Sequence, residues 1–298
     1  MPLLARMRLD RAKRCFVEHL DSLFVRRVGG GYTTAMKEKI RELLYPTAGD
    51  PIPLFCPEKN FVAIWSAKSG CTQTLLWYFG HRDFLKEQKA FDPWPHLYRT
   101  DVICASPEYY QSIRSADLSR TKWLRVIRDP FKRAVSSYQQ ALLNGYHDAS
   151  MSAFLGRPVD AASGYSFREY VSWLEQANPA ILNPHERPQR HALEDWVQPH
   201  VVVLEKGDLW QALREFEEIN DIEPMSTANA AMLQAEAQRI SDIHHSTRGP
   251  VANGDEIRFS RGAKPAIWPS YSDMLATSGR KALEKVYAVD FAAYAQLL

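Results

Sequence analysis

The sequence has no long apolar run. A membrane-spanning helix needs about 20 predominantly apolar residues, and no uninterrupted stretch of even about 18 is present. The first residues, MPLLARMRLDRAKR, also lack the apolar core of a secretory signal. We therefore expect a cytoplasmic protein without an integral membrane segment.

Cysteine is scarce, and the net charge is close to zero. The four cysteines form no CxxC pair, which disfavours a disulfide framework or a structural zinc site and fits a reducing compartment. The formal net charge of +2 disfavours a dedicated nucleic-acid-binding surface, although a local basic cleft for anions is compatible with it. We therefore expect no nucleic acid among the partners.

The sequence also has no internal repeat and no low-complexity tract. Its 298 residues suffice for one large α/β domain with a substantial core. Apolar periodicity predicts helices over residues 3–28 and 33–44, so we assign residues 1–50 to an N-terminal helical extension and residues 51–298 to the main domain. We interpret the extension as a helical pair packed on the domain. The alternative is a basic helix that binds a membrane surface or a partner.

The first informative motif of the sequence is residues 61–79, FVAIWSAKSGCTQTLLWYF. It predicts a strand, a short loop and a helix. The first five residues form the apolar run of a buried strand, and helical apolar spacing begins at Leu75. Gly70 permits a tight turn between the two elements. Such a unit directs free main-chain N–H groups and the positive end of a helix dipole at one point. With Lys68 in the loop, the stretch predicts an anion site suited to phosphate.

The loop is not a Walker A motif, because the pattern GxxxxGK[ST] places its lysine at the start of the helix. Here Lys68 precedes the glycine, in the order Lys-Ser-Gly-Cys-Thr. The alternative interpretation of this stretch is an ordinary strand–turn–helix unit with a solvated lysine.

Residues 122–139, KWLRVIRDPFKRAVSSYQ, predict a second strand and helix. Asp129 can cap the helix, and Pro130 suits its first turn. Arg128 closes the strand, and Ser136 follows eight residues later, two turns into the helix. A guanidinium fork and a hydroxyl in these positions can bind one phosphate together. The alternative is a capped amphipathic helix with Arg128 in a surface ion pair.

Together the two stretches resemble the sulfotransferase family that uses 3′-phosphoadenosine 5′-phosphosulfate (PAPS). AKSGCT is similar to the family's 5′-phosphosulfate loop, and RDPFKRAVSSY to its 3′-phosphate signature. The RDPF variant and the Cys-Thr pair look most like the carbohydrate sulfotransferases of the family 2 type. VYAVDFAAY, near the C-terminus, resembles the Tyr-x-x-Asp-Phe pattern of this family. The resemblance runs from residue 61 to about residue 140, continues more weakly to the C-terminus, and does not include residues before about 51.

The resemblance implies that residues 51–298 form a sulfotransferase domain with a P-loop-like three-layer fold. Animal members of the family typically carry an N-terminal membrane anchor, and no apolar run of that length is found in these residues. We therefore expect a soluble cytoplasmic form, which the initial Met and basic first turn favour, and the alternative is a shortened chain.

The rest of the sequence alternates strand and helix patterns, which predicts an α/β fold with a central, mostly parallel sheet flanked by helices. Ligands of such sheets bind beyond the carboxyl ends of the strands, where both motifs lie. A strand is predicted over residues 200–205. In the strand predicted over residues 123–127, Arg125 interrupts the apolar run. The other predictions are helices over residues 106–116, 167–176, 207–220, 225–239 and most of 271–298, a short strand over 101–105, and loops or irregular segments over 46–60, 91–100, 144–165, 178–189 and 243–265.

For sulfuryl transfer the protein must position two oxygens in line and stabilise the charge that builds on the bridging oxygen of the leaving phosphate. We expect Lys68 to stabilise that charge. We expect Arg128 and Ser136 to bind the 3′-phosphate. No metal is required, and PAPS is the co-substrate that the resemblance implies. The full set of expected cofactor-binding residues is Lys68, Ser69, Gly70, Cys71, Thr72, Arg128, Ser136, Arg248, Arg261 and Gly262.

The acceptor hydroxyl needs a general base, and histidine is the natural choice near neutral pH. His96 is the first candidate, because it lies between the two motifs and carbohydrate sulfotransferases have a histidine at a similar place. His185 is the second, because NPHERPQ resembles the family's His-Trp-x-Pro-Gln stretch, with Glu186 in place of the tryptophan. The alternative for either histidine is a surface or loop-stabilising role.

The sequence thus predicts a PAPS-dependent sulfotransferase that acts on a hydroxyl of a saccharide or polysaccharide. The carbohydrate acceptor rests on the resemblance, since most of the eight tryptophans are expected in the core. The alternatives are a non-catalytic nucleotide-binding module of the same fold and a P-loop kinase-like phosphotransferase. The kinase would need a Walker lysine and an acidic magnesium-binding pair, and neither is found.

Overall fold

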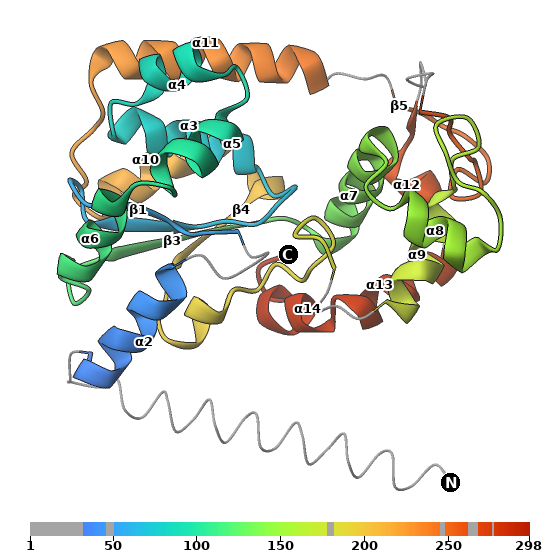
Figure 1. Cartoon of the computed structure of the whole chain (residues 1–298), viewed down its shortest axis with the longest axis horizontal. Coiled ribbons are helices and arrows are strands. Elements are labelled where there is room, and N and C mark those ends of the chain that lie inside the picture. Colours follow the sequence, from blue (N-terminus) through green and yellow to red (C-terminus); the bar gives the residue numbers. More distant parts are fainter. Residues whose placement is uncertain (1–31, 46–50, 178–181, 245–247, 262–267, 276) are drawn as a thin grey trace, which may run out of the picture.

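A four-stranded sheet forms the centre of one lobe of the protein (Figure 1). The computed structural model describes residues 32–45, 51–177, 182–244, 248–261, 268–275 and 277–298. The strands lie in the order β1 (Leu54–Cys56), β2 (Phe61–Ile64), β3 (Lys122–Ile127) and β4 (His200–Val203). β2, β3 and β4 are parallel, and β1 is antiparallel at the edge. The predicted α/β fold with a mostly parallel sheet is confirmed.

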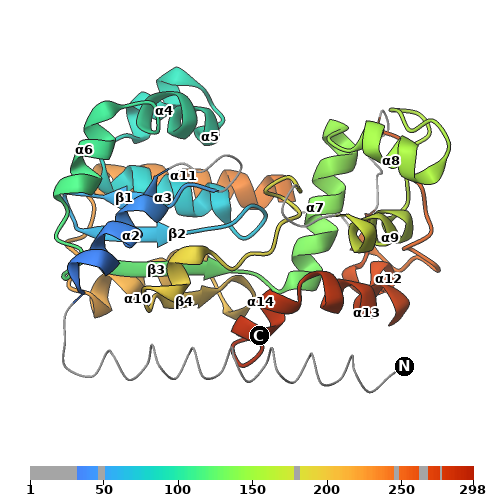
Figure 2. The ribbon, with the colours of Figure 1, turned by 60° about the horizontal axis from the view of Figure 1, so that its bottom comes forward.

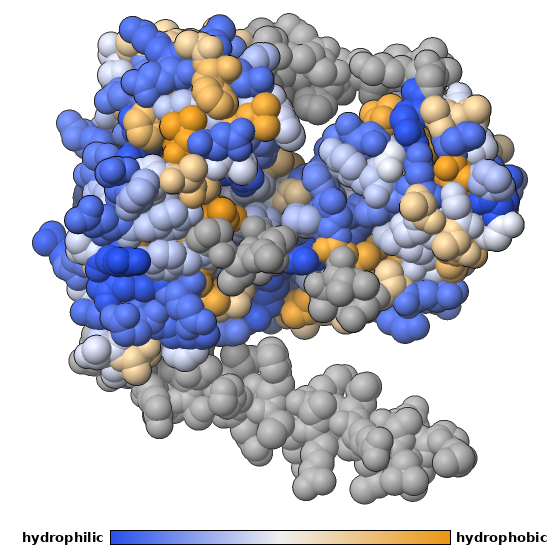
Figure 3. Space-filling view, in the orientation of Figure 1, coloured by the Kyte–Doolittle hydropathy of each residue, from blue (hydrophilic) through white to orange (hydrophobic). Residues whose placement is uncertain are grey.

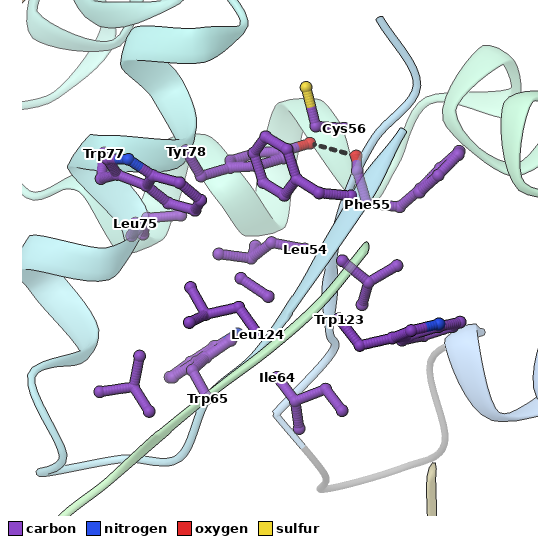
Figure 4. Close-up of a cluster of buried hydrophobic side chains, with 14 of the residues drawn as sticks. Leu54, Phe55, Cys56, Ile64, Trp65, Leu75, Trp77, Tyr78, Trp123 and Leu124 are labelled. Atoms are coloured by element: carbon purple, nitrogen blue, oxygen red, sulfur yellow. Dashed lines mark hydrogen bonds between the residues drawn. The ribbon is translucent and has the colours of Figure 1, made fainter. Parts of the chain in front are cut away.

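The core of this lobe follows from the apolar strand patterns. All four residues of β2 are buried, as expected for a strand covered on both faces. α3 (Cys71–His81) packs on the sheet, and the Tyr78 hydroxyl donates a hydrogen bond of 3.0 Å to the main-chain oxygen of Phe55 on β1 (Figure 4). The lobe also contains α2 (Thr34–Leu44), α4 (Leu85–Phe91), α5 (Pro95–Tyr98), a π-helical turn (Arg99–Ile103), α6 (Pro107–Ser115), α10 (Leu209–Ile219) and α11 (Thr227–His244).

A second lobe is built from helices (Figures 1 and 2). It consists of α7 (Pro130–Asn144), α8 (Asp148–Leu155), α9 (Phe167–Gln176), α12 (Tyr271–Met274) and α13 (Thr277–Val286), with the short parallel pair β5 (Arg248–Gly249) and β6 (Trp268–Pro269). These helices enclose their own hydrophobic cluster, which includes Val135 and Tyr138 of α7. α7 follows β3 directly and so connects the lobes. α14 (Ala288–Tyr294) contacts β3, where Arg125 donates a hydrogen bond to the hydroxyl of Tyr294. Figure 3 shows a hollow between the two lobes.

Several predicted elements were wrong. Residues 91–100 were expected to form a loop because prolines flank Trp94, yet Pro95 occupies the first turn of α5, where its missing N–H costs nothing. Residues 101–105 form no strand, because 101–103 end the π-helical turn and 104–105 form an ordinary turn, and residues 144–165 include α8.

The remaining differences concern boundaries. The proline-rich lead-in over residues 46–60 contains β1. One 3₁₀ turn, Ala192–Asp195, precedes β4, and another, Leu204–Lys206, follows it. α11 extends to His244, into the segment that was expected to be a loop. The predicted helix over residues 3–28 lies outside the described residues, whereas the second predicted helix corresponds to α2. In the described ranges, no helix has the length and apolarity needed to cross a bilayer.

Candidate functional site

The loop between β2 and α3 brings Lys68 to the carboxyl edge of the sheet. Gly70 caps α3 with φ of 72°, and a Cβ there would lie 2.8 Å from Cδ2 of Leu209, so both conformation and space favour glycine. Lys68 itself has φ of 66°, an uncommon conformation for a residue with a side chain. Inside the loop, the hydroxyl of Ser66 donates to that of Ser69 at 3.0 Å. These features define the path of the loop between β2 and α3.

Arg128 connects this loop to α7. Its Nη1 donates to the hydroxyl of Ser136 at 2.7 Å and to the main-chain oxygen of Lys68 at 3.0 Å. Its Nη2 donates to the hydroxyl of Tyr271 at 2.8 Å, and Glu205 lies 3.3 Å from Nε. The two residues assigned to the 3′-phosphate thus lie together, beside the loop assigned to the 5′-phosphosulfate.

One face of α7 supplies most of the remaining contacts. Arg133, Ser136, Ser137 and Gln140 follow the spacing i, i+3, i+4 and i+7, which places them on one side of a helix. The Lys68 Nζ donates to Oε1 of Gln140 at 3.2 Å. Ser137 donates to the main-chain oxygen of His185, in the segment between β3 and β4, at 2.6 Å. α7 therefore holds Lys68 and His185 on the same face.

His96 reaches the loop from α5. Its Nε2 lies 3.4 Å from the hydroxyl of Thr72, and its ring packs beside that of Trp65. Burial alone would raise the pKa of the Cys71 thiol. A hydrogen bond with His96 and the charges of His96 and Lys68 outweigh burial and lower this pKa from 9.0 to about 6. The thiol at the start of α3 is thus expected to be largely ionised at neutral pH.

This ionisation predicts unusual reactivity for Cys71. Its rate of alkylation by iodoacetamide should rise through about pH 6 and level off by about pH 7. An ordinary thiol gains reactivity up to about pH 9, so the plateau should move to higher pH in the His96→Ala variant. Cys104 is the internal control, because burial raises its pKa and it should stay unreactive over the same range. Mass spectrometry of the alkylated peptides measures both rates, and a Cys71 profile that still rises at pH 8 would contradict the prediction.

His185 lies in the segment between β3 and β4, held to α7 by Ser137. Its Nδ1 is 2.7 Å from Oδ1 of Asn183. Burial lowers the pKa of His185 to about 4, with the attraction of Glu186 outweighed by the nearby positive charges of Lys68, Arg133 and His96. His185 is therefore neutral at pH 7. The structure thus connects His96 to the start of α3 and His185 to α7, the two helices next to the Lys68 loop.

Glu186, which stands where the family pattern has tryptophan, points away from this group. It is fully buried, where it accepts a hydrogen bond of 3.1 Å from Tyr170 and lies 3.1 Å from Nε2 of His147. Both partners belong to the second lobe. The residue thus anchors the segment that carries His185 instead of facing the site.

Of the other three expected phosphate contacts, Arg261 bonds elsewhere and two lie outside what the structure describes. Arg261 pairs with Asp148 and donates to the main-chain oxygen of Leu142 at 2.9 Å, at the carboxyl end of α7. Arg248 contributes its main chain to β5, and its side chain lies outside what the structure describes. Gly262 also lies outside the described residues.

Sequence reasoning missed two buried residues of the site. Gln189 is 2% exposed; its Oε1 accepts from the hydroxyl of Ser69 (2.7 Å) and the N–H of Arg128 (2.9 Å), and its Nε2 donates to the oxygen of Arg128 (2.7 Å). A cavity of about 270 Å³ lies beside it. Arg133 is 1% exposed and donates to the main-chain oxygens of Ala67 (2.9 Å) and Pro184 (3.2 Å). The two side chains fix the loop of Lys68 and the segment of His185 relative to each other.

Gln189 ends the NPHERPQ stretch, and Arg133 lies within RDPFKR, so both stood in motifs that had been singled out. Helical spacing from Ser136 would have found Arg133. Nothing in the sequence pairs Gln189 with the first motif.

Within the described part of the chain, no three His, Cys, Asp or Glu side chains converge as metal ligands. No protein-family model matches the sequence, and no curated protein or solved structure matches the chain. The motifs and the geometry of the site are therefore the grounds for the function proposed below.

Proposed function

We propose that this protein transfers a sulfuryl group from PAPS to a hydroxyl of a carbohydrate acceptor, on a P-loop-like three-layer fold. The observation that carries the proposal is the position of Arg128. It bonds at once to Ser136 and to the main chain of Lys68, so the two predicted phosphate elements meet at the carboxyl ends of adjacent parallel strands. Ligands of α/β sheets bind at this edge.

The site offers two separate sets of donors for anions. The first turn of α3 presents main-chain N–H groups and the positive end of its dipole, which suit a 5′-phosphate. The guanidinium of Arg128 and the hydroxyl of Ser136 suit a second phosphate, and a hydrogen bond from a charged donor contributes about 1.5–3 kcal/mol. A nucleotide with both a 5′- and a 3′-phosphate uses both elements.

Lys68 has the role of stabilising the leaving group. In the transfer, a bond forms between the acceptor oxygen and sulfur while the bond between sulfur and the bridging phosphate oxygen breaks. Negative charge builds on that bridging oxygen. The ammonium of Lys68, which donates a hydrogen bond to Gln140, is the cation that stabilises this charge. The acceptor proton passes to a histidine.

The two candidate histidines differ in their surroundings. His96 is linked to the thiol of Cys71 and the hydroxyl of Thr72, so its orientation is fixed by α3. His185 is neutral at pH 7 and free to accept a proton, but its pKa of about 4 makes it a weak base. We keep His96 as the first candidate and His185 as the second.

The test compares 3′-phosphoadenosine 5′-phosphate (PAP) with ADP by thermal shift, with EDTA present. A ligand at a hundred times its Kd adds about 2.7 kcal/mol, which is a shift of about 5 °C or more for a chain of this size. We expect that shift with PAP and a much smaller one with ADP. Arg128→Ala and Ser136→Ala should each reduce the difference between the two nucleotides, measured against each variant's own melting temperature.

Arg120→Ala is the matched control. Arg120 is exposed and precedes the amino end of β3, whereas Arg128 follows its carboxyl end. It should leave the difference unchanged. Equal shifts with PAP and ADP, or shifts that require magnesium, would overturn the proposal in favour of a phosphotransferase or a general nucleotide-binding module.

A further inference from the structure

Large aromatic side chains that face solvent are few in the described part of the chain. They are Phe91 (51% exposed), Trp94 (55%) and Tyr146 (44%). Trp94 lies beside His96, with ring centroids 5.4 Å apart, and Tyr146 lies beside His185, with ring centroids 5.6 Å apart. Two of the three thus flank the two candidate bases.

The two aromatic side chains come from opposite lobes. Trp94 lies between α4 and α5 of the first lobe, and Tyr146 in the turn between α7 and α8 of the second. His96 is fixed to the Lys68 loop through Thr72, and the main chain of His185 to α7 through Ser137. α7 also carries Gln140, the hydrogen-bond partner of the Lys68 Nζ, so both histidines are connected to the elements that hold Lys68.

The Lys68 Nζ and the groups bonded to it and to His96 are polar. They are the ammonium of Lys68, the hydroxyl of Thr72 and the amide of Gln140. A surface that docks an apolar protein partner presents one contiguous apolar patch, which this is not. Two aromatic faces from different lobes, together with these hydrogen-bonding groups, suit a chain of sugar rings, whose C–H faces stack on aromatics and whose hydroxyls need polar partners.

We propose that Trp94 and Tyr146 form a two-sided platform for an oligosaccharide acceptor, which stacks one sugar ring on the aromatic face beside each candidate base. The inference rests on the proposed function and extends it by assigning the acceptor-binding residues. It also specifies an acceptor of at least two pyranose rings, one for each aromatic face.

The test is binding of oligosaccharides to the full chain loaded with PAP. The probes are chitohexaose, maltohexaose and an unsulfated chondroitin hexasaccharide, titrated by calorimetry. For a probe that binds, Trp94→Ala and Tyr146→Ala should each raise its Kd by about threefold to tenfold. Trp94→Phe and Tyr146→Phe should restore most of the affinity, since they keep an aromatic face.

Phe91→Ala is the matched control. Phe91 is equally exposed but packs on Tyr98, at a centroid distance of 5.8 Å, instead of on a histidine. It should leave the saccharide Kd unchanged, and every variant should keep the PAP thermal shift. A disaccharide from the same series should bind more tightly than its monosaccharide.

The two proposals fail in different ways. If PAP stabilises the protein but no probe binds, or if the alanine variants bind a probe as well as the unmodified chain, the platform is wrong and the nucleotide site stands. If PAP gives no shift but the alanine variants still weaken saccharide binding, the platform stands as a saccharide site and the sulfotransferase proposal is wrong.

Discussion

Replacement of Lys68 by alanine should lower kcat for sulfuryl transfer by roughly 10²–10³-fold, the cost of removing one preorganised group that stabilises transition-state charge. PAP binding should fall by less than about tenfold, because the loop keeps its other contacts. The bond that Arg128 makes to residue 68 is to the main-chain oxygen, which alanine retains. Single-turnover rates give kcat, and calorimetry with PAP gives the Kd.

Two further variants make this result specific. Lys68→Arg keeps the charge and should recover part of the rate. Gln140→Leu removes the partner of the Nζ but not the charge, so it should cost less than about tenfold in kcat. A Lys68→Ala protein that keeps kcat within about threefold of the unmodified chain would contradict the assigned role, and one that fails to fold would make the lysine structural.

The elements that carry the site were predictable because local signals define them. Gly70 and Asp129 mark the starts of α3 and α7, and the Asp129 carboxylate accepts from the N–H of Lys132 at 2.9 Å, as its capping role predicts. The apolar runs of β2 and β3 are typical of parallel strands. Since parallel strands align their carboxyl ends, the pairing of Lys68 with Arg128 and Ser136 followed from the order of the motifs.

Contacts between distant segments could not be predicted in this way. Gln189 bonds to Ser69 across 120 residues of sequence and to Arg128 across 61. It lies in a segment without helix or strand, so no apolar periodicity fixed where its side chain would point. The burial of His185 was hidden for the same reason, because its low pKa depends on surroundings that only the fold brings together.

The second large expected effect concerns the free energy of unfolding, and it comes from the charged residue inside β3. Arg125 interrupts the apolar strand, and the structure buries it completely. Its Nε lies 3.0 Å from Oε1 of Glu194, and one of its amino groups donates to the main-chain oxygen of Gln189. Glu194→Ala leaves this guanidinium buried without its carboxylate, which should cost about 3–5 kcal/mol of unfolding free energy. Urea denaturation measures the loss as a lower midpoint at constant slope.

The exposed pair of Arg41 and Glu38, 2.7 Å apart on α2, is the control. Glu38→Ala should cost less than about 1 kcal/mol, because water screens that pair. Since Arg125 also holds the main chain of Gln189, Glu194→Ala should weaken PAP binding under conditions where the variant is still folded, whereas Glu38→Ala should not. A Glu194→Ala protein that loses less than about 1 kcal/mol would show that Arg125 finds water or another partner in the core. In that case, Gln189 would hold Ser69 and Arg128 in place without support from the strand.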